Sequence, residues 1–374
     1  MIRIDEIYTG TLSSWIQRNR PDLRLIYLDP FGATDPASLQ VQGHILQDKN
    51  YVLFFDQEPL QLDLHAATFD RVQQQITADF APEHWYVQTR GHARPAQLGH
   101  IVTSELNSAA VAAVCERYGW QSHYYWFHGW AALDWYRGYN RSGQIAPPKE
   151  RTIRKTFVLP NRIIGGRRTH RLQLLYYVFK YQLRNNYISC PAVCPVENKP
   201  IETLLAEGVA MTDAVEVFRS VDLPLNMPGE QGHPMHSAQL SLFAQAADSL
   251  LYVVTETVAT GRRLHLTEKT FKPICLQMPF VLVGTCGSLE YLRSYGFRTF
   301  GDIWDERYDA IEDDDLRIAA VAEVLRELDA KTPAQKQNIF EQCRDIVEHN
   351  YRHFYSGGFE QILWQEFNSM LSEL

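Results

Sequence analysis

An acid and a base stand side by side where the sequence predicts the start of a helix. Thr267, Glu268 and Lys269 lie in LHLTEKTFKPICLQMPFVLVG (264–284), before an apolar run that predicts a strand. The Thr267 hydroxyl is a helix-capping group, and the helix dipole favours Glu268 in the first turn. A lysine there opposes the dipole by only about 0.3–1 kcal/mol, so a solvated Lys269 would be tolerated. Alternatively, Lys269 and the free backbone N–H groups form one anion site suited to a diphosphate, while Glu268 accepts hydrogen bonds from sugar hydroxyls.

A second acid and two arginines precede this segment. Glu256 ends the predicted strand SLLYVVTE (249–256), and Arg262 and Arg263 follow in the loop. Glu256 and Glu268 thus bracket a basic loop. This arrangement suits a ligand that is anionic at its centre and rich in hydroxyls at its edges, as a nucleotide sugar is.

A second basic cluster lies in LPNRIIGGRRTHRLQLL (159–175), which reads as a strand, a loop and a helix. The loop carries Arg162, and the helix start carries His170 and Arg171. Between positions 149 and 184 there are ten Lys/Arg residues and one acid, although the whole chain has a net charge of −8. A solvated helix face would explain the cluster; the alternative is a second phosphate-directed group. Neither a GxxxxGK[ST] nor a GxGxxG motif is present.

The segments around these clusters alternate between apolar strands and amphipathic helices. We predict strands at 23–29, 51–56, 100–105, 156–160, 249–256 and 280–284, and at 122–130 a strand followed by a loop. We predict helices at 67–80, 107–120 (capped by Asn107), 170–183, 237–247, from about Thr267, at 288–295, from 312, and through most of the last ninety residues. Such alternation is typical of α/β folds with parallel sheets, which bind ligands beyond the carboxyl ends of their strands.

Length and composition indicate a globular protein of two domains. The hydrophobic content of 45% indicates a globular protein, and 374 residues are more than one ordinary hydrophobic core accommodates. Glycine, proline and charges cluster at 141–155 and predict a linker, which separates domains at 1–145 and 155–345 from C-terminal helices at 346–374. Whether those helices pack back on the first domain is left open.

The net charge, the apolar segments and the cysteines restrict the partners and the cellular location that we expect for this chain. The acidic net charge argues against coating nucleic acid by charge alone, but it leaves room for a local basic groove. We expect no signal peptide and no membrane span. The six cysteines are scattered, and Cys190 and Cys194 lack a second ligand pair with zinc spacing. We therefore expect reduced thiols, no metal site and a cytoplasmic location.

The run VVTETVATGRRLHLTEKTFKPICLQMPFVLVG (253–284) resembles the donor-site signature of the α1,3-fucosyltransferases. It is more similar still to fucosyltransferase-like proteins met in phage and bacterial genomes. Further matching pieces are Asn161–Arg162, His170–Arg171 and GFRTFGDIWDERYD (296–309), so the resemblance covers about residues 155 to 310.

This resemblance implies a GT-B architecture, in which two Rossmann-like domains face a central cleft. The first domain would bind the acceptor and the second the nucleotide-sugar donor, a co-substrate rather than a cofactor. Transfer would invert the sugar carbon without an essential metal, because Lys269, Arg162 and Arg171 are available to stabilise the leaving diphosphate. The donor-binding residues would be Arg162, His170, Arg171, Glu256, Arg263, Thr267, Glu268 and Lys269.

The N-terminal part offers candidates for the catalytic base. VLFFDQEPLQLDL (52–64) resembles the family's strand that ends in an acid-bearing loop, which makes Glu58 the base. Asp56 is the alternative, because the chain has Asp-Gln-Glu-Pro where the family has Gly-Glu-Asn. His128 is either a second catalytic residue or a core histidine among aromatics. Glu105 is a second-choice acid.

The predicted function is therefore a nucleotide-sugar-dependent glycosyltransferase. Its acceptor would be a glycan or a hydroxylated base of the kind found in modified phage DNA. The alternative function is a non-catalytic sugar-nucleotide or glycan-binding protein of the same fold.

Overall fold

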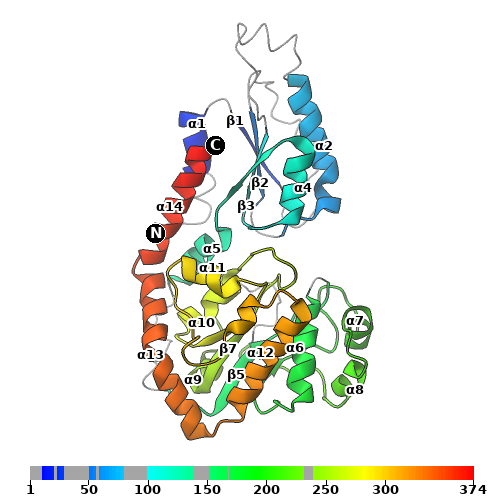
Figure 1. Cartoon of the computed structure of the whole chain (residues 1–374), viewed down its shortest axis with the longest axis vertical. Helices are drawn as coiled ribbons and strands as arrows, with labels where there is room; N and C mark the ends of the chain where they lie inside the picture. Colours follow the sequence, from blue (N-terminus) through cyan, green and yellow to red (C-terminus); the bar gives the residue numbers. More distant parts are fainter. Residues whose placement is uncertain are drawn as a thin grey trace. The chain divides into compact units, whose positions relative to one another are not determined.

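The chain divides into two compact units, each considered by itself below (Figure 1). The computed structural model describes residues 11–20, 23–28, 50–55, 59–79, 99–138, 151–166, 168–230 and 239–374. Unit 1 comprises Met1–Asp134 and Ile362–Leu374, and unit 2 comprises Trp135–Gln361. The predicted linker at 141–155 falls partly outside the described residues, and the predicted domain bounds stay a prediction.

Unit 1 contains a four-stranded parallel sheet in the order β1-β2-β3-β4. Each strand lies beside the next one in the sequence, so the strand order of this sheet runs in one direction and does not reverse. Its elements are α1 (Ser14–Asn19), β1 (Leu23–Tyr27), β2 (Asn50–Phe55), α2 (Leu62–Asp79), β3 (Gly99–Thr103), α4 (Ala109–Tyr118), β4 (Gln121–Tyr124) and the start of α5 (Phe127–Tyr136).

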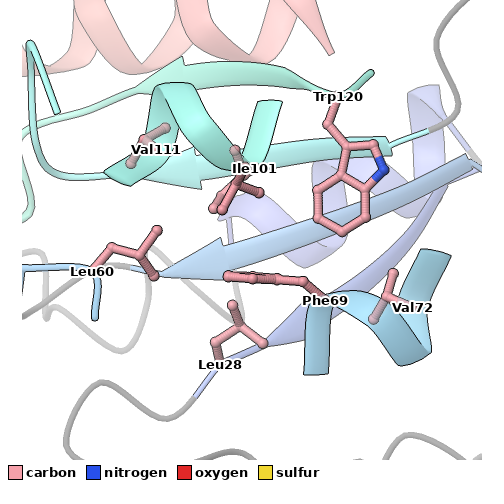
Figure 2. Close-up of a cluster of buried hydrophobic side chains, with 8 residues drawn as sticks. Leu28, Leu60, Phe69, Val72, Ile101, Val111 and Trp120 are labelled. Carbon is pink, nitrogen blue, oxygen red and sulfur yellow. The ribbon is translucent and has the colours of Figure 1, made fainter. Parts of the chain in front are cut away.

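The core of unit 1 lies between this sheet and helices α2 and α4 (Figure 2). Phe69 meets Trp120 edge to face, with ring centroids 5.9 Å apart. The Trp120 indole covers Gly99, where any side chain would overlap the ring. The Trp120 N–H donates to Gln73 at 2.9 Å, which satisfies the polar end of an otherwise buried ring.

The last residues of the chain complete unit 1. In this unit α14 (Gly358–Glu373) packs along α5, where Trp130 and Trp364 have ring centroids 4.6 Å apart. The Trp126 backbone N–H donates to the Glu366 carboxylate at 2.8 Å. Aromatic contacts and charged hydrogen bonds therefore hold the C-terminal helix in place.

Unit 2 contains a second four-stranded parallel sheet, in the order β6-β5-β7-β8. All seven residues of β7 are buried, as expected for a parallel strand covered on both faces. The α/β class with parallel sheets is therefore confirmed. The elements are β5 (Lys155–Pro160), α6 (Thr169–Lys180), β6 (Tyr187–Ser189), α7 (Ile201–Gly208), α8 (Ala214–Arg219), α9 (Phe243–Asp248), β7 (Ser249–Thr255), 3-10 helix η6 (Glu268–Thr270), α10 (Phe271–Cys275), β8 (Phe280–Val283), α11 (Ser288–Ser294) and 3-10 helix η7 (Arg307–Ala310).

The helical C-terminus is also confirmed. Helix α12 (Asp314–Asp329) lies beside α6 and is followed by α13 (Pro333–Tyr355) and α14 (Figure 1). Its predicted start is correct, since the Asp313 side chain accepts the Leu316 backbone N–H at 2.9 Å. None of the helices in the described ranges combines the length and apolar character that a membrane crossing needs.

The prediction of a strand and loop at 122–130 was wrong in its second half. Strand β4 ends at Tyr124 and helix α5 starts at Phe127. The first seven residues of α5 are all buried, so the segment lacks the polar face that marks a helix in a sequence.

Two predicted helix starts also differ from the structure. Asn107 adopts the left-handed conformation (φ 54°), and the cap of α4 is Ser108, whose hydroxyl accepts the Val111 N–H at 3.3 Å. The helix predicted at 237–247 begins only at Phe243, because Leu242 is also left-handed (φ 64°). A residue with positive φ cannot continue a right-handed helix.

Candidate functional site

The order of strands in unit 2 defines where a ligand would bind. The chain runs from β5 outward to β6 and then returns to β7 on the other side of β5. Loops that leave β5 and β7 therefore diverge at the carboxyl edge, and such switch points are the usual ligand sites of parallel α/β sheets. Arg162 follows β5, and Glu256 and then Lys269 follow β7. The two predicted clusters thus lie at the ends of adjacent strands.

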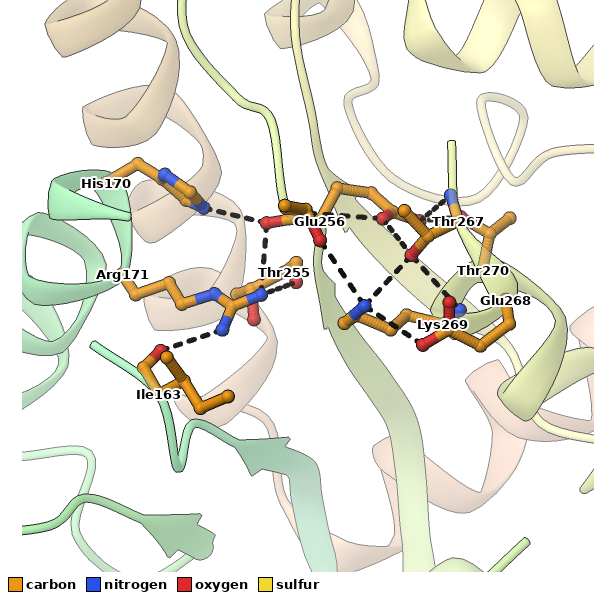
Figure 3. Close-up of polar contacts among 10 residues, drawn as sticks. Ile163, His170, Arg171, Thr255, Glu256, Thr267, Glu268, Lys269 and Thr270 are labelled. Atoms are coloured by element: carbon orange, nitrogen blue, oxygen red, sulfur yellow. Dashed lines mark hydrogen bonds and ion pairs between the residues drawn. The ribbon is translucent and has the colours of Figure 1, made fainter. Parts of the chain in front are cut away.

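Glu256 organises the loop that carries Lys269 (Figure 3). Its side chain is fully buried. One carboxylate oxygen accepts the Thr267 backbone N–H at 3.1 Å and the Thr270 hydroxyl at 2.6 Å. The other accepts the Thr267 hydroxyl at 2.6 Å and the Thr257 backbone N–H at 3.3 Å. The Glu256 carboxylate therefore bonds to its own loop, and its predicted contact with a donor sugar stays a prediction.

His170 and Arg171 connect the start of α6 to the end of β7 (Figure 3). His170 Nε2 lies 3.0 Å from the Glu256 carbonyl oxygen, which can only accept, so this nitrogen carries the hydrogen. Burial and the neighbouring Arg171 lower the pKa of His170 to about 3, so the ring is neutral at physiological pH. It acts as a hydrogen-bond donor within the protein.

Arg171 bonds to backbone carbonyls of both strand ends. Its guanidinium donates to the Ile163 oxygen at 2.7 Å and to the Thr255 oxygen at 2.9 Å. Burial lowers the pKa of Arg171 to about 9, which leaves it charged at neutral pH. The residue fixes the spacing of the loops after β5 and β7. A direct contact with a diphosphate, as predicted for Arg171 and His170, stays a prediction.

Lys269 is a partly exposed cation at this edge, with 32% of its side chain exposed. Its ammonium lies 3.0 Å from the Glu268 carboxylate, 3.1 Å from the Thr267 hydroxyl and 3.4 Å from the Thr257 hydroxyl. Thr267 also accepts the Lys269 backbone N–H at 3.4 Å, so the predicted cap is confirmed. The helix it opens is a single 3-10 turn followed by the five-residue α10.

Arg162 is the second cation, and its side chain is also 32% exposed. Its guanidinium lies 3.4 Å from the carboxylate of Glu230, which is only 7% exposed. The preceding residue, Asn161, anchors the loop: its side-chain oxygen accepts the Thr255 hydroxyl at 2.6 Å and its backbone N–H donates to Ser189 at 2.8 Å. The backbone just before Arg162 is therefore held in place at the ends of β5, β6 and β7.

The turn between Arg162 and α6 needs its glycines. A side chain at Gly165 would overlap the Glu197 carboxylate, and Gly166 has a left-handed φ of 64°. The loop thus turns tightly from β5 into α6 against Glu197. The adjacent Arg167 lies outside the described residues.

A further arginine, Arg317, fixes the neighbouring loops. The buried Arg317 side chain donates to the Ala259 oxygen at 2.7 Å and to the Gly284 oxygen at 3.0 Å. Arg263, on the loop after β7, is half-buried, and its carbonyl accepts the Thr285 hydroxyl at 3.0 Å. Arg317 follows the acidic start of α12, and the sequence carries no signal that its side chain would turn inward.

The predicted catalytic residues belong to unit 1. Glu58 and its alternative Asp56 lie outside the described residues. Two positions after Glu58, the Leu60 backbone N–H donates to the buried Glu105 carboxylate at 2.7 Å, so Glu105 anchors the end of that loop. His128 is 6% exposed within α5, beside the Phe127 ring. This burial favours the core interpretation, and a catalytic role for His128 stays a prediction.

No family model, no curated protein and no solved structure matches this chain. The resemblance to the fucosyltransferases therefore rests on the sequence motifs given above. The geometry of unit 2 adds a separate observation: Arg162 and Lys269, two partly exposed cations, lie on loops that leave adjacent strands at a switch point.

Proposed function

We propose that this chain is an inverting glycosyltransferase that moves a sugar from a nucleotide-sugar donor to a hydroxyl group. In this proposal the two units form a GT-B arrangement, and the diphosphate of the donor binds to Arg162 and Lys269. The acceptor is a glycan or a hydroxylated DNA base.

One observation carries the proposal. Arg162 and Lys269 are equally exposed cations on loops after β5 and β7. Both loops are fixed by buried contacts of Glu256, Arg171 and Asn161. Positive groups held in place before the ligand arrives stabilise developing negative charge without reorganisation. A diphosphate leaving group develops such charge.

The chemistry follows as a single displacement. The acceptor hydroxyl oxygen attacks the anomeric carbon from the face opposite the diphosphate, and its proton passes to the Glu58 carboxylate. The bond from carbon to the diphosphate oxygen breaks, and its electron pair leaves with the diphosphate, which Arg162 and Lys269 stabilise. Inversion follows because there is one displacement only. Arg171, His170, Glu256 and Thr267 position the two loops.

The proposal is tested first by ligand-dependent stability. Thermal unfolding is measured with GDP, UDP, CMP and their sugar conjugates, all at the same concentration. The nucleotide class that binds is expected to add about 2.7 kcal/mol of stability when this concentration is about one hundred times its Kd, which raises the unfolding midpoint by roughly 5 °C or more. The absence of any shift across the whole panel would contradict the proposal.

Glu58→Gln is expected to abolish transfer while the affinity for the donor stays unchanged. Loss of a general base lowers turnover by about 10²–10⁴-fold, because the acceptor hydroxyl keeps its proton. Transfer rate and donor Kd are measured side by side, with Asp56→Asn as the matched variant that should retain activity. If Asp56→Asn is the inactive one, the base is Asp56. If the donor Kd rises in Glu58→Gln, this residue does not act as the base.

The same assays decide between acceptors and between functions. Activity on DNA should fall steeply as salt is added, because phosphate contacts release counterions, whereas activity on a neutral glycan should not. Donor binding without transfer or hydrolysis, across glycan and DNA acceptors, would instead indicate the non-catalytic binding protein.

A further inference from the structure

The two cations of the candidate site share a feature that the proposed function does not explain. Each is paired with a carboxylate that is more buried than the cation itself. Arg162 pairs with Glu230 at 3.4 Å, and Lys269 pairs with Glu268 at 3.0 Å. The side chain of the cation is 32% exposed in both pairs, and the side chains of Glu230 and Glu268 are 7% and 4% exposed. The charge that would bind an anion is therefore already compensated from within the protein.

The carboxylates of the two pairs both act on one buried residue. Tyr252, in the middle of β7, has its pKa raised first by burial and then by the negative charges of Glu230 and Glu268. Both carboxylates must lie near one phenol for this to occur, because electrostatic effects between side chains decline with distance. Arg162 and Lys269 thus have their counterions around the same buried tyrosine.

The Arg162 pair differs from the Lys269 pair in how the carboxylate is held. Glu268 is the residue next to Lys269, so the backbone itself keeps that pair together. Glu230 comes from a separate segment, 68 positions after Arg162 (230 − 162). The oxygen of Glu230 near Arg162 also accepts the Met227 backbone N–H, at 3.4 Å. This N–H can remain with Glu230 when Arg162 moves away, so the pair can separate without leaving the carboxylate devoid of a donor.

We propose that Glu230 is the internal counterion of Arg162 and that the diphosphate of the ligand displaces it. This inference rests on the proposed function and adds a residue which sets affinity at that site. Arg162 exchanges one carboxylate for a phosphate group, and the cost of separating the pair is part of the binding free energy. An anion that contacts Arg162 alone gains little binding free energy, because the contact with Glu230 is lost as the contact with the anion forms. A diphosphate that also reaches Lys269 gains a second contact, so Glu230 favours diphosphates over single phosphates.

The test is the affinity for inorganic pyrophosphate, measured by calorimetric titration of the full chain at one salt concentration. Glu230→Gln keeps the size of the side chain and an acceptor for Met227 but removes the charge. It is expected to bind pyrophosphate about three- to thirtyfold more tightly than the wild type, the range for a partly buried charged pair. In the Arg162→Met background the same substitution should give no gain. Glu290→Gln, at an exposed position of α11, is the matched control and should stay within about twofold.

A structural role for Glu230 would give the opposite sign, since a loosened loop binds more weakly. Unchanged or weaker binding by Glu230→Gln with a wild-type unfolding midpoint overturns the proposal, as does a gain that persists without Arg162. If Glu230→Gln does not fold, Glu230→Asp is used, whose shorter side chain should give a smaller gain; no gain there also overturns it. If the wild-type protein binds neither pyrophosphate nor any nucleoside diphosphate, the proposed function is contradicted as well. Binding that depends on Lys269 but not on Glu230 removes this inference alone.

Discussion

Lys269→Met is expected to weaken nucleoside diphosphate binding by about 10- to 150-fold and to lower turnover by at least about a hundredfold. The ammonium lies 3.0 Å from Glu268 and the Lys269 side chain is 32% exposed, so we expect a ligand oxygen to reach it without unfolding of the loop. Methionine keeps the length of the apolar stem but neither donates nor carries charge. Turnover suffers more than binding because the charge on the diphosphate increases as the sugar bond breaks.

Two comparisons make this result specific. Lys331→Met removes the same charge at an exposed position after α12 and should leave both binding and turnover within about twofold of wild type. Lys269→Met also removes the ion pair of the buried Glu268 carboxylate, so its unfolding midpoint is expected to fall, and binding and turnover are compared at a temperature well below that midpoint. A Lys269→Met enzyme of normal turnover would remove the diphosphate site from unit 2.

Glu256→Ala is expected to destabilise unit 2 by at least about 3 kcal/mol, the largest stability effect among the site residues. Four hydrogen bonds end on this buried carboxylate, from Thr267, Thr270 and Thr257. Alanine would leave two backbone N–H groups and two hydroxyls without their acceptor in a dry environment. Urea unfolding followed by the fluorescence of the tryptophans measures the loss.

The conservative variant separates geometry from charge. Glu256→Gln keeps one oxygen for the Thr267 backbone N–H, and a threonine hydroxyl can rotate to accept from the new amide. Its cost should therefore be clearly smaller than that of alanine. Thr270→Val removes a single donor and should cost about 1 kcal/mol. Equal stability of Glu256→Ala and wild type would show that the network does not hold this loop.

The sequence was sufficient to predict seven of the eight strands in the described residues and the clusters at their ends, but not the three-residue strand β6. Strand β7 is an uninterrupted apolar run, the pattern of a doubly covered parallel strand, and Glu256 marks its end. Thr267 was recognised as a cap because its hydroxyl precedes an acid in a helical first turn. Such signals are local, so they can be found in a single sequence.

The role of each charged side chain was less predictable, because it depends on contacts between distant segments. Arg162 and Arg171 look equivalent in the sequence, yet Arg171 is buried on the carbonyls of Ile163 and Thr255 while Arg162 is partly exposed. The partner of Arg162, Glu230, follows a Pro-Gly pair in a segment with no recognisable pattern. Arg317 likewise looks like an ordinary helix residue until its long-range carbonyl partners are known.

The central claim is that Arg162 and Lys269 bind one diphosphate. A crystal structure of the protein with a nucleoside diphosphate tests it most directly. We expect diphosphate oxygens within about 3 Å of both the Lys269 ammonium and the Arg162 guanidinium, with Glu230 no longer paired to Arg162. A diphosphate bound away from these residues, or bound to one cation while the other points elsewhere, would contradict it.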